Sequence, residues 1–199
     1  MQSQSNAPVP TGPLLYQPRF DCRSGELAGA RLYIGRPEGP EKLVLDLPGE
    51  AALAPLREAC AQCAAWSRTR SQPLVLVLGA RLGTLCEPAF ALALNAILLE
   101  TQFDPQCLEI CIISTDEQVS DASITALRHL KNCGIRFTLS AASPASARLA
   151  WIRRLPLDSL EVPAHLVQDV VADPEGIAIV RALIARAHTL RLVVCATGV

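Results

Sequence analysis

Cys60 and Cys63 form a CxxC pair, the spacing found in dithiol redox centres and in one half of a zinc site. Redox pairs of this type usually lie at the start of a helix, where the helix dipole lowers a thiol pKa. Here the pair falls in the middle of a predicted helix over residues 50–68. Leu53 and Leu56 share a helix face with the two cysteines, so we interpret both thiols as core residues.

The remaining cysteines and the histidines do not have the spacing of a metal site. A zinc site would need a second ligand pair, and His129, His165 and His188 are not spaced with any cysteine to supply one. Cys107 and Cys111 flank a predicted strand, where burial is expected. The chain has eight cysteines, but it is too long and too apolar for a disulfide framework. We therefore predict no metal ion and no cofactor.

Serine nucleophiles are also not indicated. Ser114, Ser140 and Ser143 lie near predicted strand ends, but none stands in a GxSxG elbow. We expect these hydroxyls to cap loops, and we assign no catalytic residue.

The charge balance excludes several classes of partner. The 199 residues carry 18 Lys and Arg against 19 Asp and Glu, and half of the residues are apolar. This balance favours neither a nucleic-acid backbone nor an anionic membrane as partner. Arg148, Arg153 and Arg154 form a short basic stretch, which we interpret as a solvated helix face rather than a phosphate site.

The predicted elements alternate between strands and helices after a polar N-terminal segment. Residues 1–12 are expected to form a flexible tail. Strands are predicted over residues 14–20, 28–34, 73–78, 107–113, 135–139, 159–162 and 191–196, and helices over 50–68, 88–100, 121–133, 144–153 and from 173 onward. No stretch reaches the roughly 18 apolar residues of a membrane span, and no secretory signal is present, so a cytoplasmic location is expected.

Buried strands alternating with amphipathic helices predict an α/β fold with parallel βα units after an N-terminal hairpin. Two architectures fit this order, an open doubly wound sheet and a βα barrel. No GxGxxG fingerprint and no P-loop is present to support a nucleotide site in an open sheet.

The order of these segments resembles the EAL domain, a family of cyclic di-GMP phosphodiesterases with a βα (TIM-type) barrel. The resemblance rests on six stretches in the family's order: LLYQPRFDCRSGELAGARL, LREACAQCAAW, LVLVLGARL, LRHLKNCGIRFTLS, RRLPLDSLEV and IVRALIARAHTLRLVVCATGV. It implies a single EAL-like domain over residues 13–199. The family continues beyond the last stretch with a helix, an eighth strand and a final helix, so we expect a barrel that is incomplete at its C-terminus.

The family's chemistry, as the resemblance implies it, is hydrolysis by water that divalent cations activate, with carboxylates and an Asn as ligands. Other residue types stand at the matching positions: Arg31 for the Glu of the signature tripeptide, Gly35 for an Arg, Val77 for the Asn, Cys111 and Ser114 for two Glu, Ser140 and Ala141 for two Asp, Glu161 for a Lys, and Thr197 for a late Glu. Hard divalent cations need oxygen ligands. The chain is therefore expected not to be an enzyme. Glu109 is expected to point to the opposite face of its strand and not to compensate.

A remnant of the family's nucleotide pocket is expected at Gln17, Arg31, Arg36 and Glu161. Arg31 and Glu161 exchange the signs of the family's Glu and Lys, so we predict that they form an ion pair across the barrel mouth. Cyclic di-GMP should then bind weakly or not at all.

These observations predict a catalytically inactive, degenerate EAL-like domain that regulates cyclic di-GMP-related signalling through protein–protein interaction. The alternative is a metal-independent receptor that binds cyclic di-GMP through Gln17 and Arg36, and an active phosphodiesterase is the least expected. The predicted partner is another protein or a second copy of the chain, bound at the open edge next to strand 191–196. Neither a nucleic acid nor a membrane is expected as partner.

Overall fold

The computed structural model describes residues 12–35, 41–42, 44–45, 50–113, 119–140, 153–168 and 174–198, with only the backbone described for 41–42, 44–45 and 50–52. The expected tail over residues 1–12 lies outside these residues except for Gly12.

The chain enters the fold through an antiparallel hairpin of β1 (Leu14–Phe20) and β2 (Leu27–Ile34). The carboxylate of Asp21 accepts hydrogen bonds from the backbone N–H groups of Arg23 and Ser24, each at 2.9 Å. This Asx-type turn reverses the chain between the two strands. The predicted hairpin is confirmed.

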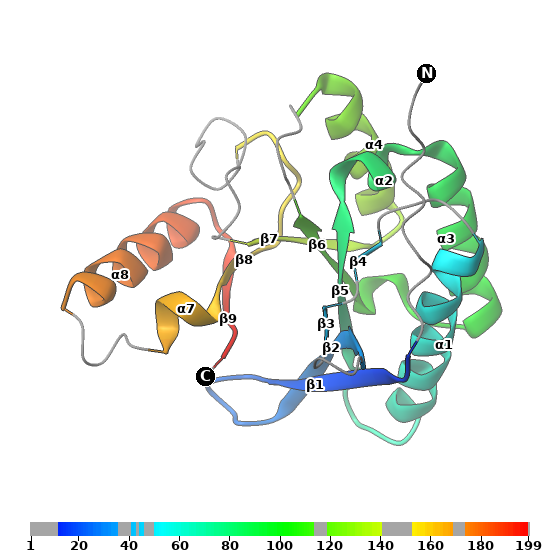
Figure 1. Cartoon of the computed structure of the whole chain (residues 1–199), viewed down its shortest axis with the longest axis horizontal. Coiled ribbons are helices and arrows are strands. Elements are labelled where there is room, and N and C mark those ends of the chain that lie inside the picture. Colours follow the sequence, from blue (N-terminus) through cyan, green and yellow to red (C-terminus); the bar gives the residue numbers. More distant parts are fainter. Residues whose placement is uncertain are drawn as a thin grey trace.

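The remaining strands extend this hairpin into one curled sheet that forms a half-barrel (Figure 1). The strand order is β1-β2-β5-β6-β7-β8-β9, and all neighbours from β2 onward along this order are parallel. The strands after the hairpin are β3 (Glu41–Lys42), β4 (Val44–Leu45), β5 (Val75–Arg81), β6 (Leu108–Ile113), β7 (Arg136–Ser140), β8 (Ser159–Val162) and β9 (Val193–Ala196). Within the described residues, β1 and β9 are the two edges of the sheet. The curled sheet agrees with the βα barrel and not with the open doubly wound sheet, the two architectures that the sequence left open.

Helices cover the outer face of the sheet (Figure 1). They are α1 (Glu50–Ser67), α2 (Leu82–Cys86), α3 (Pro88–Thr101), α4 (Asp121–Asn132), α7 (Ala164–Val167) and α8 (Pro174–Thr189), with a 3₁₀ turn at Pro105–Cys107. Strand residues of one parity pack beneath these helices and form the core. They include Leu32, Leu76, Leu78, Ile110, Phe137 and Leu139, all essentially inaccessible to solvent. None of the helices in the described part of the chain is long and apolar enough to cross a membrane.

Helix α4 has a capping residue at its start and a glycine directly after its end. The Ser120 hydroxyl accepts a hydrogen bond from the Ser123 N–H at 3.1 Å, so Ser120 is the capping residue. Gly134 has φ of +102° directly after the helix, a conformation that favours glycine. The local sequence therefore specifies both ends of this helix.

Several other boundaries differ from the prediction. Strand β5 starts at Val75 instead of 73 and runs to Arg81, because its hydrogen bonding with β6 continues to the pair Arg81 and Ile113. Strand β9 starts at Val193 instead of 191, because Arg191 has φ of +58° in the turn after α8. Arg153 lies in a turn and not in the predicted helix over 144–153, whose other residues lie outside the described part.

Candidate functional site

The inner face of the curled sheet carries the residues that could do chemistry. Strand pairing places Gln17 opposite Arg31, Arg31 opposite Val77, and Val77 opposite Glu109. Directly paired residues share a face of the sheet. Successive residues of a strand point to opposite faces, so these residues lie on the face opposite to the apolar residues that pack under the helices. The enclosed side of the sheet is therefore polar, whereas its outer side is apolar.

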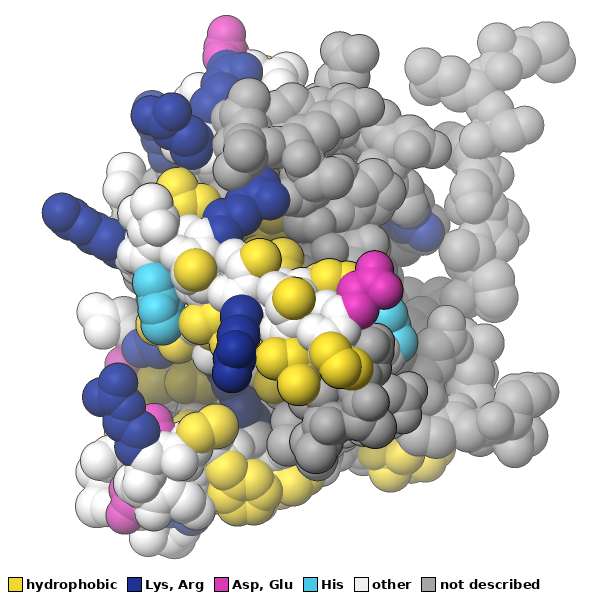
Figure 2. Space-filling model, turned by 90° about the vertical axis from the view of Figure 1, so that its left-hand side faces the viewer, with side chains coloured by type: hydrophobic (Ala, Val, Ile, Leu, Met, Phe, Trp, Pro, Cys, Tyr) yellow, Lys and Arg dark blue, Asp and Glu magenta, His cyan; other side chains and the backbone are white. Residues whose placement is uncertain are grey.

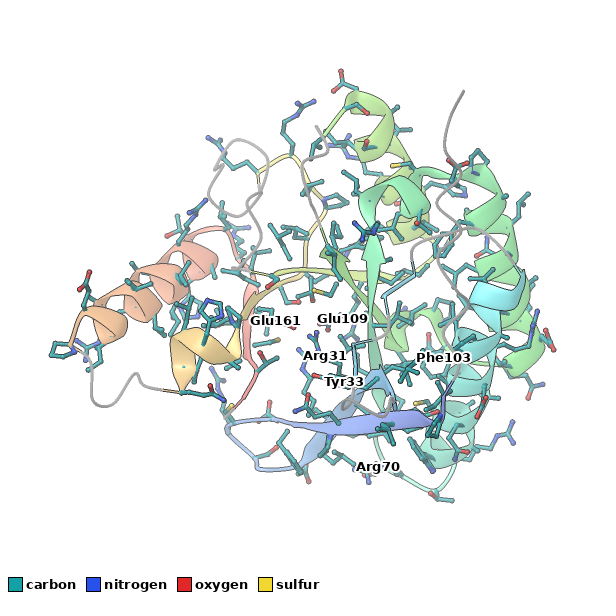
Figure 3. The ribbon with its side chains drawn as sticks, viewed as in Figure 1. Arg31, Tyr33, Arg70, Phe103, Glu109 and Glu161 are labelled. Atoms are coloured by element: carbon teal, nitrogen blue, oxygen red, sulfur yellow. The ribbon has the colours of Figure 1, made fainter. Side chains whose placement is uncertain are left out.

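The predicted ion pair between Arg31 and Glu161 is formed. The Arg31 Nη2 contacts the Glu161 Oε2, and the two side chains are 12% and 1% exposed. Arg31 extends from β2 and Glu161 from β8, so the contact spans the enclosed space between distant strands. Figure 3 shows Arg31, Glu161 and Glu109 pointing toward one another there.

A second ion pair, not predicted, lies beside the first. The Arg19 Nη1 donates to both carboxylate oxygens of Glu109, at 2.9 Å each. The Thr138 hydroxyl donates to Glu109 Oε1 at 2.5 Å, and Ser159 lies 3.5 Å from the same oxygen. The placement of Glu109 on the opposite face was wrong: residues two apart in a strand share a face, so Glu109 and Cys111 both point inward. The spacing of two residues between Glu109 and Cys111 is the only sequence signal that indicates their shared face.

The pKa values of Arg19 and of the neighbouring Cys195 are both shifted by their surroundings. Burial lowers the pKa of the Arg19 guanidinium, but the charge of Glu109 and the contact with Cys195 outweigh burial and raise that pKa overall. Burial raises the pKa of the Cys195 thiol, against the opposing charge of Arg19. Arg19 therefore stays charged, and Cys195 stays a neutral thiol near pH 7.

The other predicted site residues fall into three groups: exposed, buried and outside the described residues. Gln17 is exposed, and its side-chain oxygen accepts a hydrogen bond from the Tyr33 hydroxyl at 2.8 Å. Val77 and Cys111 are buried in the strands that form the site. Arg36, Ser114, Ala141 and Ser143 lie outside the described residues. Three members of the expected remnant pocket, Gln17, Arg31 and Glu161, thus have described positions.

The metal-binding capacity of this face depends on its carboxylates. Glu109 and Glu161 each contact an arginine, which competes with a cation for the same oxygens. Across the described residues, no group of three or more His, Cys, Asp or Glu is placed to hold a metal ion.

The CxxC pair is buried in the core, as predicted. Cys60 and Cys63 are both inaccessible to solvent in the middle of α1. Burial raises the pKa of each thiol to about 12, with a further contribution to Cys60 from Cys63 and to Cys63 from Cys107. Neutral buried thiols of this kind are poor nucleophiles.

A comparison with family models matches residues 12–199 to the model described as EAL domain. Among curated proteins, the chain is 35% identical over 79 residues to the cyclic di-GMP phosphodiesterase NbdA of Pseudomonas aeruginosa, covering 40% of this chain and 10% of that protein. It is 27% identical over 120 residues to the cyclic di-GMP phosphodiesterase PdeR of Escherichia coli, covering 58% of this chain and 18% of that protein. The chain thus spans less than a fifth of the length of these relatives.

Solved structures share the fold at lower identity. The EAL domain of Mycobacterium smegmatis DcpA has a TM-score of 0.79 and 24% identity, covering 93% of this chain and 78% of that chain. The PaMucR phosphodiesterase in complex with c-di-GMP has a TM-score of 0.73 and 23% identity, covering 92% of this chain and 80% of that chain.

Proposed function

Since the chain belongs to the EAL domain family, we propose that it is a catalytically inactive member of that family. In this proposal it acts in cyclic di-GMP-related signalling by binding another protein. The observation that carries the proposal is the buried ion pair of Arg31 and Glu161 inside the half-barrel. A permanent cation stands where the resemblance to active members implies a carboxylate ligand.

The chemistry of the donor set supports the loss of hydrolysis. Divalent cations such as Mg²⁺ are held by oxygen atoms, preferably anionic ones. Val77 offers no donor atom, Cys111 offers a thiol, and Arg31 repels a cation. The two inward carboxylates, Glu109 and Glu161, are already in contact with arginines. A cation would have to displace a buried guanidinium to reach either of them.

The edges of the sheet support a role in protein binding. Strands β1 and β9 each have a partner on one side only within the described residues. Leu15 and Phe20 on β1 are 42% and 56% exposed, and Val193 on β9 is 63% exposed. Unpaired strand backbone next to exposed apolar side chains is a template for pairing with another chain. We propose that the partner, another protein or a second copy, binds here.

We expect cyclic di-GMP to bind with a dissociation constant far above 1 μM, and Mg²⁺ or Mn²⁺ to produce no hydrolysis. Losing two or three charge-assisted contacts to phosphate, at roughly 1.5–3 kcal/mol each, weakens micromolar binding to millimolar. Calorimetric titration with and without divalent cation, followed by chromatography of the nucleotide, measures both quantities. The PaMucR phosphodiesterase is the active control. Tight binding without metal would replace the proposal with a receptor, and metal-dependent hydrolysis would refute inactivity.

Hydrogen exchange tests the protein-binding part of the proposal separately. In the unbound monomer, amides on the free side of β9 (Val193–Ala196) should exchange much faster than those of β6 (Leu108–Ile113), which has strand neighbours on both sides. Protection of β9 that grows with protein concentration would identify a second copy as the partner. A strict monomer with slow exchange along both β1 and β9 would rule out an open edge.

A further inference from the structure

A cavity lies at the end of the sheet where β8 and β9 begin, away from the proposed site residues. Its volume is about 330 Å³. The segment that leads into β8 contributes Arg153, Leu155 and Leu157, and the turn between α8 and β9 contributes Leu190, Arg191 and Leu192. Thr189 at the end of α8 also lines it, so the lining mixes leucine side chains with a hydroxyl and two guanidinium groups. A volume near 300 Å³ is at the lower end of the range for small-molecule sites.

The two arginines of this cavity have no counter-charge in the described part of the chain. Neither Arg153 nor Arg191 makes an ion pair or a side-chain hydrogen bond there, and the described lining contains no acidic residue. The neighbouring Arg154, in contrast, contacts Asp121. Figure 2 shows Lys and Arg side chains gathered over the upper part of this face of the molecule. The cavity thus brings together leucine side chains and two guanidinium groups that have no ion-pair partner in the described part of the chain.

Arg191 occupies a backbone position that does not favour arginine. Its φ is +58°, in the left-handed region, and it follows a helix end where glycine is the usual residue. The Arg191 side chain is not needed to cap α8, because nearby groups already donate hydrogen bonds to the carbonyls of the last helical turn. The N–H groups of Leu190, Arg191 and Leu192 donate to the carbonyls of residues 186–188, and the Thr189 hydroxyl donates to that of Ala185. An arginine at this position costs conformational energy, and its side chain forms no hydrogen bond or ion pair within the described part of the chain.

The geometry points to a binding site for a small organic oxyanion, in which Arg153 and Arg191 hold a carboxylate or phosphate group and the leucines contact an apolar body. Guanidinium groups match planar carboxylates and phosphates through paired N–H donors. The four leucines offer an organic anion apolar contacts that a fully hydrated inorganic ion cannot make. This site lies at the end of the strands opposite to the Arg31 and Glu161 pair, so it is independent of the proposed function.

Calorimetry with phenyl phosphate, benzoate and inorganic phosphate at constant ionic strength tests the site on the full chain. The two aromatic anions separate a phosphate ligand from a carboxylate ligand, and at least one should bind more tightly than inorganic phosphate. Arg153→Gln and Arg191→Gly should each weaken that binding about tenfold or more, as expected for lost charge-assisted hydrogen bonds.

The Arg191→Gly variant also separates binding from folding. Because it relieves the left-handed backbone, its melting temperature should be equal to or above that of the parent chain. Gln102→Gly is the matched control: Gln102 has φ of +54° at the end of α3 and should keep full anion affinity when replaced. Absence of binding for both aromatic anions would overturn the site, and so would affinity that is unchanged in Arg153→Gln and Arg191→Gly.

Discussion

Replacing Glu161 by alanine should lower the free energy of unfolding by roughly 3–5 kcal/mol, because it leaves the Arg31 charge buried without a partner. Glu161 is 1% exposed and Arg31 is 12% exposed, so water cannot take over the lost contact without opening the half-barrel. Urea unfolding followed by circular dichroism measures the change.

The exposed ion pair of Arg57 and Glu100 is the matched control for this effect. Its side chains are 35% and 60% exposed, and Glu100→Ala should cost no more than about 1 kcal/mol. The double variant Arg31→Met/Glu161→Leu should be far less destabilised than Glu161→Ala, since no unpaired charge remains. A loss below 1 kcal/mol for Glu161→Ala would show that the pair is hydrated and does not fill the lumen.

Raising the pH from 8 to 10.5 should remove about 4 kcal/mol of stability through Cys60 and Cys63 together. The pKa of each thiol is raised from 9.0 to about 12 in the folded chain, mainly by burial. Unfolded thiols therefore ionise as the pH passes 9, while the folded thiols stay protonated. The contribution of the two thiols to the free energy of unfolding is fully present below pH 9 and is lost as the pH rises toward 12. Tyr16, whose pKa burial raises from 10.0 to about 12, adds a loss of the same sign above pH 10.

Denaturant unfolding at several pH values, with three variants, isolates the thiol contribution. Cys60→Ala/Cys63→Ala should be less stable at pH 8 but should lose about 4 kcal/mol less on going to pH 10.5. Cys22→Ala, which removes an exposed thiol, is the matched control for the loss of a cysteine. If the double variant shows the same pH dependence as the parent chain, the two thiols ionise in the folded state and the core around them is open to water.

The contacts of the candidate site could be predicted only where the family resemblance indicated how the strands are arranged in space. The exchanged signs at Arg31 and Glu161 predict their contact because the resemblance places both strands around one barrel. Arg19 and Glu109 are 90 positions apart. Nothing in the sequence around Arg19 indicates that it would meet Glu109. Two arginines on different turns, Arg153 and Arg191, gave no sequence signal of a shared cavity.

The sequence alone determined the order of strands and helices, the hairpin around Asp21 and the end of α4 at Gly134. These features depend on residues within one or two turns of each other, so their causes are present in the local sequence. The tertiary structure alone decided where β5 and β9 begin and end, that Glu109 meets Arg19, and that Arg153 and Arg191 line one cavity. Each of these depends on how the sheet curls, because the curl determines which distant inward-facing side chains meet and how far each strand finds a hydrogen-bonding neighbour.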